Sequence, residues 1–261
     1  MDFKAIDAMK KDLAAMRPLN PTEVKALRDQ FVIENTYNSN AIEGNTMTLR
    51  ETALILQEGV TIGGKSVKEH LEIVGHKDAM EYVYSLVESH RQLTEFTIKE
   101  IHSLVLMDDP NNRGVYRKVA VGVGAHRPPD PAQIPQEMER LMAEYKVRAA
   151  SAHPIEAVAW LHLKFENVHP FVDGNGRTGR LLLNFELMKA GFLPIDVKFS
   201  DRAAYYQCFG EFDERGDVGP LSRLVAKYEE QRLREYLRML ARAAGPEPAA
   251  QPQNERGGWS R

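Results

Sequence analysis

Hydrophobic residues recur along this chain mainly at the three- and four-residue spacing of amphipathic helices. This spacing predicts helices over residues 21–38, 134–147, 155–168, 178–190, 205–212 and 221–240. The first sixteen residues are amphipathic as well. Because helical segments follow one another along most of the chain, the pattern predicts an all-α fold.

Local signals mark the expected ends of several helices. Capping boxes pair a Ser or Thr with a Glu three positions later, ahead of an apolar run. The pairs are Thr48 with Glu51, Ser66 with Glu69, and Thr97 with Glu100. Pro154 suits the first position of a helix, and Gly191 suits the position just after a helix end.

One segment does not have the helical period. Residues 115–123, VYRKVAVGV, alternate β-branched positions and lie between Gly114 and Gly124. The prolines at 128, 129 and 131 then interrupt regular structure. The pattern predicts a small β-hairpin within the helical fold.

Composition narrows the class of protein. Of the 261 residues 43% are hydrophobic, enough for a sizeable core, and the net charge of −3 argues against broad binding to nucleic acid or an anionic membrane. Cys208 is the single cysteine, which excludes a disulfide framework and a cysteine metal cluster. With no apolar run of membrane-spanning length and no signal peptide, we expect a soluble cytoplasmic protein without a membrane partner.

The domain organisation follows from the same pattern. Residues 1–244 contain no evident linker or repeat, and we expect one domain with an N-terminal helical extension. Residues 245–261 are rich in Pro, Gly and polar residues, so we expect a disordered tail.

The loop from His169 to Arg180, HPFVDGNGRTGR, has the composition of a phosphate-binding site. Gly174, Asn175 and Gly176 precede a predicted helix, where backbone N–H groups converge and the helix dipole attracts anions. Arg177 and Arg180 are three residues apart and share a helix face, so both can reach phosphate oxygens.

Two further residues of the loop add chemistry. Asp173 is a hard oxygen ligand of the kind that holds Mg2+ beside phosphates, and His169 can take a proton from a hydroxyl nucleophile. Taken singly, the histidine could be structural, the glycines a plain turn and Asp173 a helix cap. Their joint occurrence predicts phosphoryl or nucleotidyl transfer, and the residues alone leave open which phosphorus is attacked.

At this point the loop resembles the signature of the Fic family, His-x-Phe-x-Asp/Glu-Gly-Asn-Gly-Arg-x-x-Arg, at every fixed position. The resemblance extends from about residue 31 to about residue 236. It implies an all-α Fic-type bundle with a small β-hairpin flap, and transfer of AMP from ATP to a protein hydroxyl. His169 would be the base, Asp173 would hold Mg2+ or Mn2+, and Phe171 would anchor the loop. Gly176 argues against the kinase chemistry of related Doc toxins, which have Lys there.

A second motif lies upstream of the loop. Ser39-Asn-Ala-Ile-Glu43-Gly44 resembles the inhibitory motif of the same family, in the class that has its inhibitory helix before the Fic core. The resemblance implies that Glu43 pairs with Arg180 and crowds the γ-phosphate site, while Ser39 supports the helix or the loop. In some relatives the same glutamate positions a water that removes AMP, so AMP removal stays open here.

The resemblance also suggests where the target and the base of ATP bind. The flap position is occupied by Val119, Ala120, Val121, Gly122, Val123 and Gly124. Such a flap would align a target segment by backbone hydrogen bonds. Tyr205 and Tyr206 match a pair that frames adenine in relatives, whereas Asp213 or Glu214 stands where a relative has Asn. That departure leaves the donor nucleotide open.

The leading hypothesis is therefore an autoinhibited protein adenylyltransferase with ATP as substrate. Its partner would be a protein with a hydroxyl side chain, which could be the chain itself. The alternatives are a nucleotide-sensing binding module and transfer of UMP or phosphocholine. We expect no DNA-binding domain, since few residues follow the last predicted helix. A homodimer would be in line with relatives.

Overall fold

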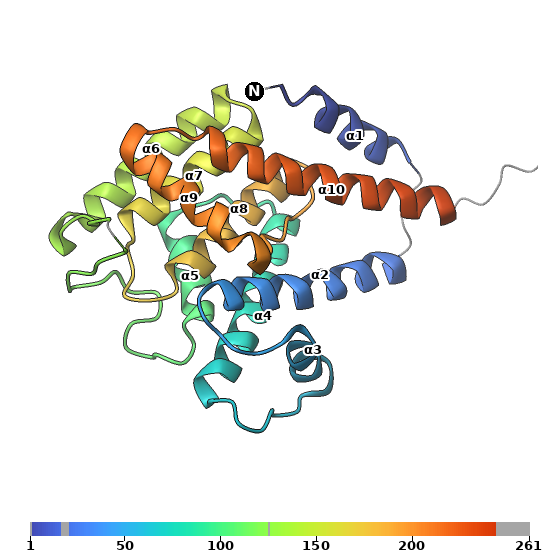
Figure 1. Ribbon diagram of the computed structural model, residues 1–261. Helices are drawn as coiled ribbons and strands as arrows, with labels where there is room; N and C mark the ends of the chain where they lie inside the picture. The colour runs from blue at the N-terminus through green and yellow to red at the C-terminus, as the bar shows by residue number, and fades with distance from the viewer. Residues whose placement is uncertain (1, 17–20, 125, 244–261) are drawn as a thin grey trace, which may run out of the picture.

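The computed structural model describes residues 2–16, 21–124 and 126–243, and this part of the chain is built from α-helices (Figure 1). In chain order they are α1 (Lys4–Ala15), α2 (Pro21–Ile42), α3 (Leu49–Glu58), α4 (Val67–Glu88), α5 (Glu95–Val105), α6 (Ile134–Ser151), α7 (Pro154–Val168), α8 (Asn175–Lys189), α9 (Arg202–Arg215) and α10 (Gly219–Ala243). Short 3₁₀ turns, η1 (Pro131–Gln133) and η2 (Phe199–Asp201), precede α6 and α9. The expected all-α fold is confirmed. The predicted tail, residues 245–261, lies outside the described residues.

Helices α7 and α8 form the centre of the molecule. They pack against each other, and α8 also contacts α2, α4 and α5. Helix α10 runs beside α1 on one side of this pair, whereas α3 and α4 lie on the opposite side (Figure 1). The buried side chains of α8 include Asn175, Arg177, Arg180 and Asn184. Because these polar groups are buried at the centre, the packing of the fold is coupled to their hydrogen bonds.

Most predicted helix ends are found where expected. The capping boxes at Thr48 and at Ser66 are both formed, at the starts of α3 and α4. Gly191 has a positive φ of 77°. Its N–H donates to the carbonyl of Met188, as in a Schellman motif at the end of α8.

The capping box predicted at Thr97 was wrong. Helix α5 starts earlier, at Glu95, and Thr94 is its cap, accepting a hydrogen bond from the backbone N–H of Thr97. Glu100 instead accepts a hydrogen bond from the hydroxyl of Tyr82. Thr97 and Glu100 therefore lie inside α5 and do not cap it.

The expected hairpin is much reduced. Among the described residues there is no extended strand, and one isolated antiparallel bridge joins Val123 to His126. Val115, Val119 and Val123 are exposed, so the β-branched side chains have no apolar surface to pack on. Since an isolated two-stranded hairpin is marginal in water, the segment stays mostly irregular.

Three histidines are buried inside the helical core. His76 lies on α4, His102 on α5 and His162 on α7, and each is fully buried. Burial disfavours the charged ring, and it lowers the pKa to about 3 for His76, to about 4 for His102 and to about 4 for His162. Burial acts in the opposite direction on Glu229 of α10, whose pKa it raises to about 7.

No helix in the described ranges is both long and apolar enough to cross a membrane.

The first prediction concerns the contact between α4 and α5. A Cβ at Gly75 would collide with the carbonyl oxygen of Leu104 and lie 3.1 Å from Met107 Cγ. Gly75→Ala should therefore lower the free energy of unfolding, measured with urea, by about 1–3 kcal/mol. Gly210→Ala on α9 is the control, because a Cβ there meets no atom within 4 Å. It should gain up to about 1 kcal/mol of helix propensity, and equal losses in both variants would contradict the packing argument.

The second prediction concerns pH. Below the unfolded value near 6.5, the unfolded chain protonates His76, His102 and His162 while the folded chain does not, so folding stability is lost as pH falls towards 4. Glu229 changes stability in the opposite direction. Its raised pKa lets the folded chain bind this proton at a higher pH than the unfolded chain does, so this group adds stability as pH falls. The net slope should be on the order of 3 kcal/mol per pH unit between pH 6 and 5.

Urea unfolding across this pH range measures the slope. His76→Gln should reduce it by about 1.4 kcal/mol per pH unit, whereas His90→Asn at an exposed position should leave it unchanged. A slope that is the same in both variants would show that His76 is not buried uncharged.

Candidate active site

The loop between α7 and α8 has an unusual backbone at both ends. His169 follows α7 in the left-handed conformation, with φ 48° and ψ 61°, and Gly174 precedes α8 with φ 75°. A non-glycine residue there costs about 1–2 kcal/mol, so the surroundings must hold His169 in place. The backbone N–H groups of Asn175, Gly176 and Arg177 open α8 and have no partner within the helix, which suits them to an anion.

Asn175 fixes the shape of the loop with its side chain. Its Oδ1 accepts from the N–H of Phe171 and its Nδ2 donates to the carbonyl of Phe171, both at 2.9 Å. The ring of Phe171 is fully buried and stacks on His102 at 3.6 Å between centroids. The role of Phe171 as a loop anchor agrees with this packing, and Asn175 contributes only its backbone to the anion site.

His102 is a site residue that the sequence analysis did not find. Its Nδ1 accepts from the N–H of Gly114 at 2.8 Å, and its Nε2 lies 2.9 Å from the carbonyl of Asp173. The two partners assign an uncharged ring with its proton on Nε2, in line with its lowered pKa. A lone histidine among apolar helix positions gave no signal for this role.

His169 lies beside a second carboxylate that the sequence analysis also missed. Its Nδ1 is 3.3 Å from the backbone carbonyl of Glu166 and 3.6 Å from Glu166 Oε2. Burial alone would raise the pKa of Glu166, but the hydrogen bond from His169 and the neighbouring charges lower it overall. An ionised Glu166 favours the proton on Nδ1 of His169, which leaves Nε2 free to accept a proton.

Arg180 is the most heavily bonded side chain of the site. Its Nε donates to Ser39 Oγ at 3.0 Å, and its NH2 donates to the carbonyl of Ser39 and to Glu43 Oε1, both at 2.8 Å. Its NH1 lies 3.3 Å from the hydroxyl of Tyr205. The guanidinium is 4% exposed and the Glu43 side chain 34%. Ser39 and Glu43 thus meet Arg180 in one cluster, although they precede it in the sequence by 141 and 137 positions.

Glu43 lies directly against the start of α8. A Cβ at Gly176 would collide with its carboxylate, so the glycine leaves room for Glu43 to reach Arg180. Helix α2 ends at Ile42, and Gly44 turns the chain away with φ 99°. The structure thus brings Ser39, Glu43 and Arg180 together at the anion site, and Gly44 ends the helix that presents them.

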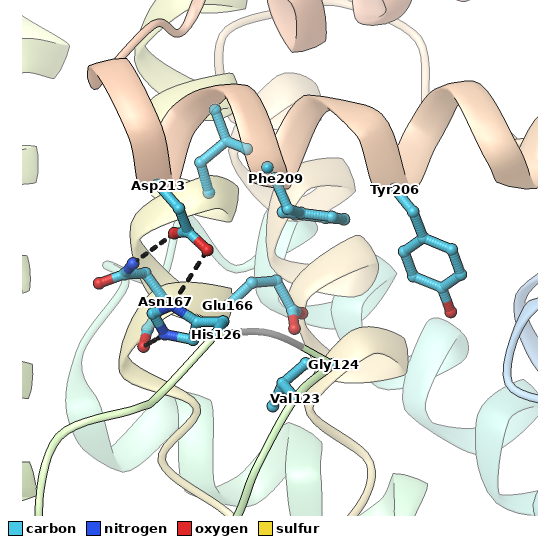
Figure 2. A pocket seen from close by; sticks show the side chains of 10 residues that line it. Val123, Gly124, His126, Glu166, Asn167, Tyr206, Phe209 and Asp213 are labelled. Carbon is cyan, nitrogen blue, oxygen red and sulfur yellow. Dashed lines mark hydrogen bonds and ion pairs between the residues drawn. The ribbon is translucent and has the colours of Figure 1, made fainter.

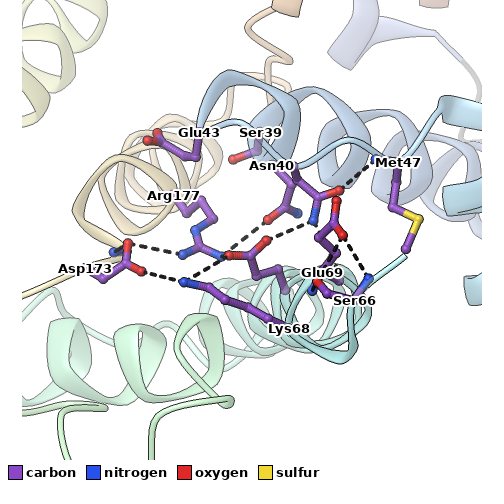
Figure 3. A network of polar contacts seen from close by, with 12 residues as sticks. Ser39, Asn40, Glu43, Met47, Ser66, Lys68, Glu69, Asp173 and Arg177 are labelled. Atoms are coloured by element: carbon purple, nitrogen blue, oxygen red, sulfur yellow. Dashed lines mark hydrogen bonds and ion pairs between the residues drawn. The ribbon is translucent and has the colours of Figure 1, made fainter. Parts of the chain in front are cut away.

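Asp173 and Arg177 belong to a second polar cluster, formed with α2 and α4 (Figure 3). Lys68 Nζ is 3.4 Å from Asp173 Oδ2. Buried Arg177 reaches Asp173 and Glu72, each at 3.5 Å, and Asn40 at 3.4 Å. Burial alone would raise the pKa of Asp173, but Arg177, the N–H of Gly174 and Lys68 lower it overall. Asp173 is therefore an ionised, half-exposed carboxylate.

No group of three or more metal-ligating side chains occurs in the described part of the chain. A divalent ion at Asp173 would therefore take its other ligands from phosphates and water. Mg2+ commonly binds in this way.

A cavity of about 430 Å³ opens beside Glu166 and Asn167 at the end of α7 (Figure 2). Val123 and Gly124 of the flap line one wall, and Tyr206, Phe209 and Asp213 of α9 line another. Tyr206 and Phe209 give the cavity an aromatic wall, which suits a flat ligand.

At one corner of the cavity, His126 connects the flap to the two helices (Figure 2). Its Nδ1 is 3.0 Å from Asp213 Oδ2 and its Nε2 2.9 Å from the carbonyl of Asn167, whose side chain also donates to Asp213. Of the two positions considered for the base contact, the structure puts Asp213 at the cavity. The sequence pattern gave no indication that His126 would line this cavity.

The two adjacent tyrosines occupy different places. Tyr206 lines the cavity and is 40% exposed, whereas Tyr205 is 1% exposed and does not line it. The hydroxyl of Tyr205 lies 2.6 Å from His162 Nε2 and bonds Arg180. Tyr205 therefore supports Arg180 from within the core rather than facing a ligand.

The expected docking segment, residues 119–124, lies on the surface, and Arg117 just before it bonds the carbonyl of His169. Val119, Ala120, Gly122, Val123 and Gly124 are exposed, and their backbone is open to pairing with another chain, apart from the Val119 carbonyl and the bridge at Val123. Val121 is half-buried.

Comparison with known proteins identifies relatives of this chain. The Fic/DOC family model matches residues 92–187. The "Protein adenylyltransferase Fic" of Nematostella vectensis is 38% identical over 91% of this chain and 56% of its own length, and that of Drosophila willistoni is 37% identical over 89% and 47%. The chain thus spans about half the length of these curated relatives.

Solved structures extend the comparison to the fold. A Fic domain containing signaling protein from Bacteroides thetaiotaomicron superposes with a TM-score of 0.82 at 27% identity, covering 92% of this chain and 96% of that one. Fic-1 (residues 134–508) from C. elegans superposes with a TM-score of 0.79 at 32% identity, covering 90% and 70%. The chain belongs to the Fic/DOC family.

Proposed function

We propose that this chain transfers AMP from ATP to a Tyr, Ser or Thr hydroxyl of a protein, and that Glu43 holds this activity low. The contact that carries the proposal is the 2.8 Å ion pair between Glu43 and Arg180, formed against Gly176 at the anion site. The names of the curated relatives support the activity. The proposal treats residues 1–244 as one Fic domain.

In the proposed reaction the target oxygen attacks the α-phosphorus of ATP, and the bond to the departing diphosphate breaks as the new P–O bond forms. Nε2 of His169 takes the hydroxyl proton, because its Nδ1 faces Glu166. The N–H groups of Asn175, Gly176 and Arg177 stabilise the negative charge of the phosphates. The cavity beside Tyr206 receives the base of the nucleotide.

The residues present fit a magnesium ion. Asp173 supplies one ionised carboxylate that is half-exposed, and it faces the start of α8 where the phosphates would bind. Bound there, Mg2+ or Mn2+ would neutralise phosphate charge. Lys68 is paired with the same carboxylate and would have to yield to the ion.

Inhibition follows from the position of Glu43. Its carboxylate occupies one donor of Arg180 and fills the space above Gly176. A γ-phosphate would meet a negative charge there and would lose Arg180 as a ligand, so ATP would lie in a pose unfit for transfer. Loss of the Glu43 side chain would free both the space and the guanidinium.

The same position supports a second role. The Glu43 side chain is 34% exposed beside the anion site, so its free carboxylate oxygen can accept a proton from a water molecule. That water could remove AMP from a modified protein, with His169 returning the proton to the leaving hydroxyl.

The third prediction tests the transfer reaction. In Mg2+ with ATP labelled at the α-phosphate, Glu43→Gly should increase labelling of protein, including the chain itself, by at least about tenfold over wild type. Adding His169→Ala should reduce the labelling at least about 100-fold. Intact mass should rise by one AMP in the Glu43→Gly protein. Glu58→Gly is the matched control, because it removes an exposed carboxylate at the end of α3 and should leave labelling at the wild-type level.

Other outcomes would replace the proposal. Label from γ-labelled ATP would show kinase chemistry. An ATP-dependent rise in melting temperature without covalent label in any variant would favour a nucleotide-sensing module. Stronger labelling by UTP or by a phosphocholine donor than by ATP would show that ATP is not the preferred donor.

The fourth prediction concerns the metal. Asp173→Asn should weaken binding of Mn2+ with ATP at least about tenfold by titration calorimetry, because it removes the ionised carboxylate proposed to hold the ion. Lys68→Met should strengthen the same binding, because it removes the competing ammonium group. Unchanged binding in Asp173→Asn would refute its role as a metal ligand.

A further inference from the structure

We infer that Arg117 is a positioning residue that holds the flap, residues 119–124, in register with His169. The inference rests on the proposed function, in which a target segment docks on the flap and His169 takes its proton. Arg117 lies between the two, at the base of the flap, and its side chain is 3% exposed.

All three guanidinium nitrogens of Arg117 donate to backbone carbonyls. Nε donates to His169 at 2.8 Å, NH1 to Val119 at 2.9 Å and NH2 to Pro129 at 2.6 Å. These carbonyls belong to the candidate base, to the first residue of the flap and to the segment that returns from it. One side chain therefore joins the three segments whose relative position decides where a docked hydroxyl lies.

The main chain of Arg117 strengthens the same connection. Its N–H donates to the carbonyl of Pro170 at 2.9 Å. Arg117 thus binds two successive carbonyls, those of His169 and Pro170, and fixes the orientation of both peptides. His169 has a left-handed backbone conformation, which is unfavourable for a non-glycine residue, and these two hydrogen bonds help to hold it.

The chemistry of the contacts requires arginine. The three carbonyls lie in different directions around a planar group, which a guanidinium fork matches and a lysine ammonium does not. Among the described residues this guanidinium forms no ion pair, and its direct partners are the three carbonyl oxygens. Burial lowers the pKa of Arg117, with Asp130 acting in the opposite direction. Burying a charge in this way is costly, and a neutral apolar residue would serve a purely structural purpose better.

The rest of the flap has few other restraints. Between Lys118 and Arg127 the described backbone has one bridge, Val123 to His126, and His126 connects the far end to α7 and α9. Arg117 is the restraint at the near end, where it bonds the carbonyls of Val119 and His169. Because misplacement of a reacting group by about 1 Å can cost on the order of 100-fold in rate, a loose base of the flap should reduce transfer even when ATP binds normally.

The test uses the full chain with Glu43→Gly as the parent, so that transfer is measurable. Arg117→Lys keeps the charge and Arg117→Ala removes the side chain, while Lys118→Met removes an exposed charge next to it. Both Arg117 variants should lose transfer to protein at least about 30-fold in kcat, with the Kd for ATP changed less than about twofold. Lys118→Met should match the parent.

Two readouts separate positioning from loss of fold. Amide hydrogen exchange should accelerate in residues 117–127 and at His169 of the Arg117 variants, and stay as in the parent in α4 and α10. Guanidinium at low millimolar concentration should restore part of the transfer in Arg117→Ala, because it refills the site of the three carbonyls.

Retention of transfer by Arg117→Lys within about threefold of the parent, or unchanged exchange of the flap, would overturn the inference. Accelerated exchange throughout the protein, together with no rescue by guanidinium, would show that Arg117 has a structural role only. If the parent itself transfers no AMP, the proposed function fails, and the exchange measurement still decides whether Arg117 holds the flap to His169.

Discussion

The buried guanidinium of Arg180 is the constraint on which the arrangement of this site depends. It is removed from water at the centre of the molecule, where an unpaired charge would be strongly unfavourable. Its partners come from α2, through Ser39 and Glu43, and from α9, through Tyr205. Burial alone would lower the pKa of Arg180, but Tyr205 and Glu43 raise it overall. The charge therefore fixes α2 against α8, and that contact sets Glu43 over Gly176.

A similar principle holds the loop that follows α7, but with uncharged groups. Asn175 closes the loop on Phe171, and His102 joins Gly114 to Asp173 with one donor and one acceptor nitrogen. Each buried polar atom in these contacts has a partner of the right kind, which makes the loop rigid. A rigid loop suits an anion site, since its N–H groups do not need to reorganise when charge develops.

The flap differs from the loop in this respect. It has exposed valines and one backbone bridge, and it is attached through Arg117 at one end and His126 at the other. A segment with open backbone groups and few packed side chains can take up another chain by strand addition. The molecule thus joins a rigid loop to a loosely restrained flap through two side chains, which is the arrangement that the proposed function needs.

Local chemistry made much of this predictable from the sequence. Helical periodicity, the boxes at Thr48 and Ser66, and Gly191 specified helices and their ends because the contacts involved lie within a few residues. The loop from His169 to Arg180 and the motif from Ser39 to Gly44 were recognisable because their spacing is itself the signal.

Tertiary structure decided the rest. The roles of His102, Glu166 and Arg117 depend on partners brought near by packing, and a single buried polar residue has no period or spacing to reveal it. Tyr205 and Tyr206 are adjacent in sequence yet one is buried and one faces the cavity, because helix geometry turns neighbours about 100° apart. The predicted hairpin is reduced to one bridge because its exposed valines have no apolar surface to pack against. The sequence alone thus determined the helical pattern and the two motifs, because their signal is local spacing. Only the fold decided which side chains meet around those motifs, because these contacts join residues far apart in the chain.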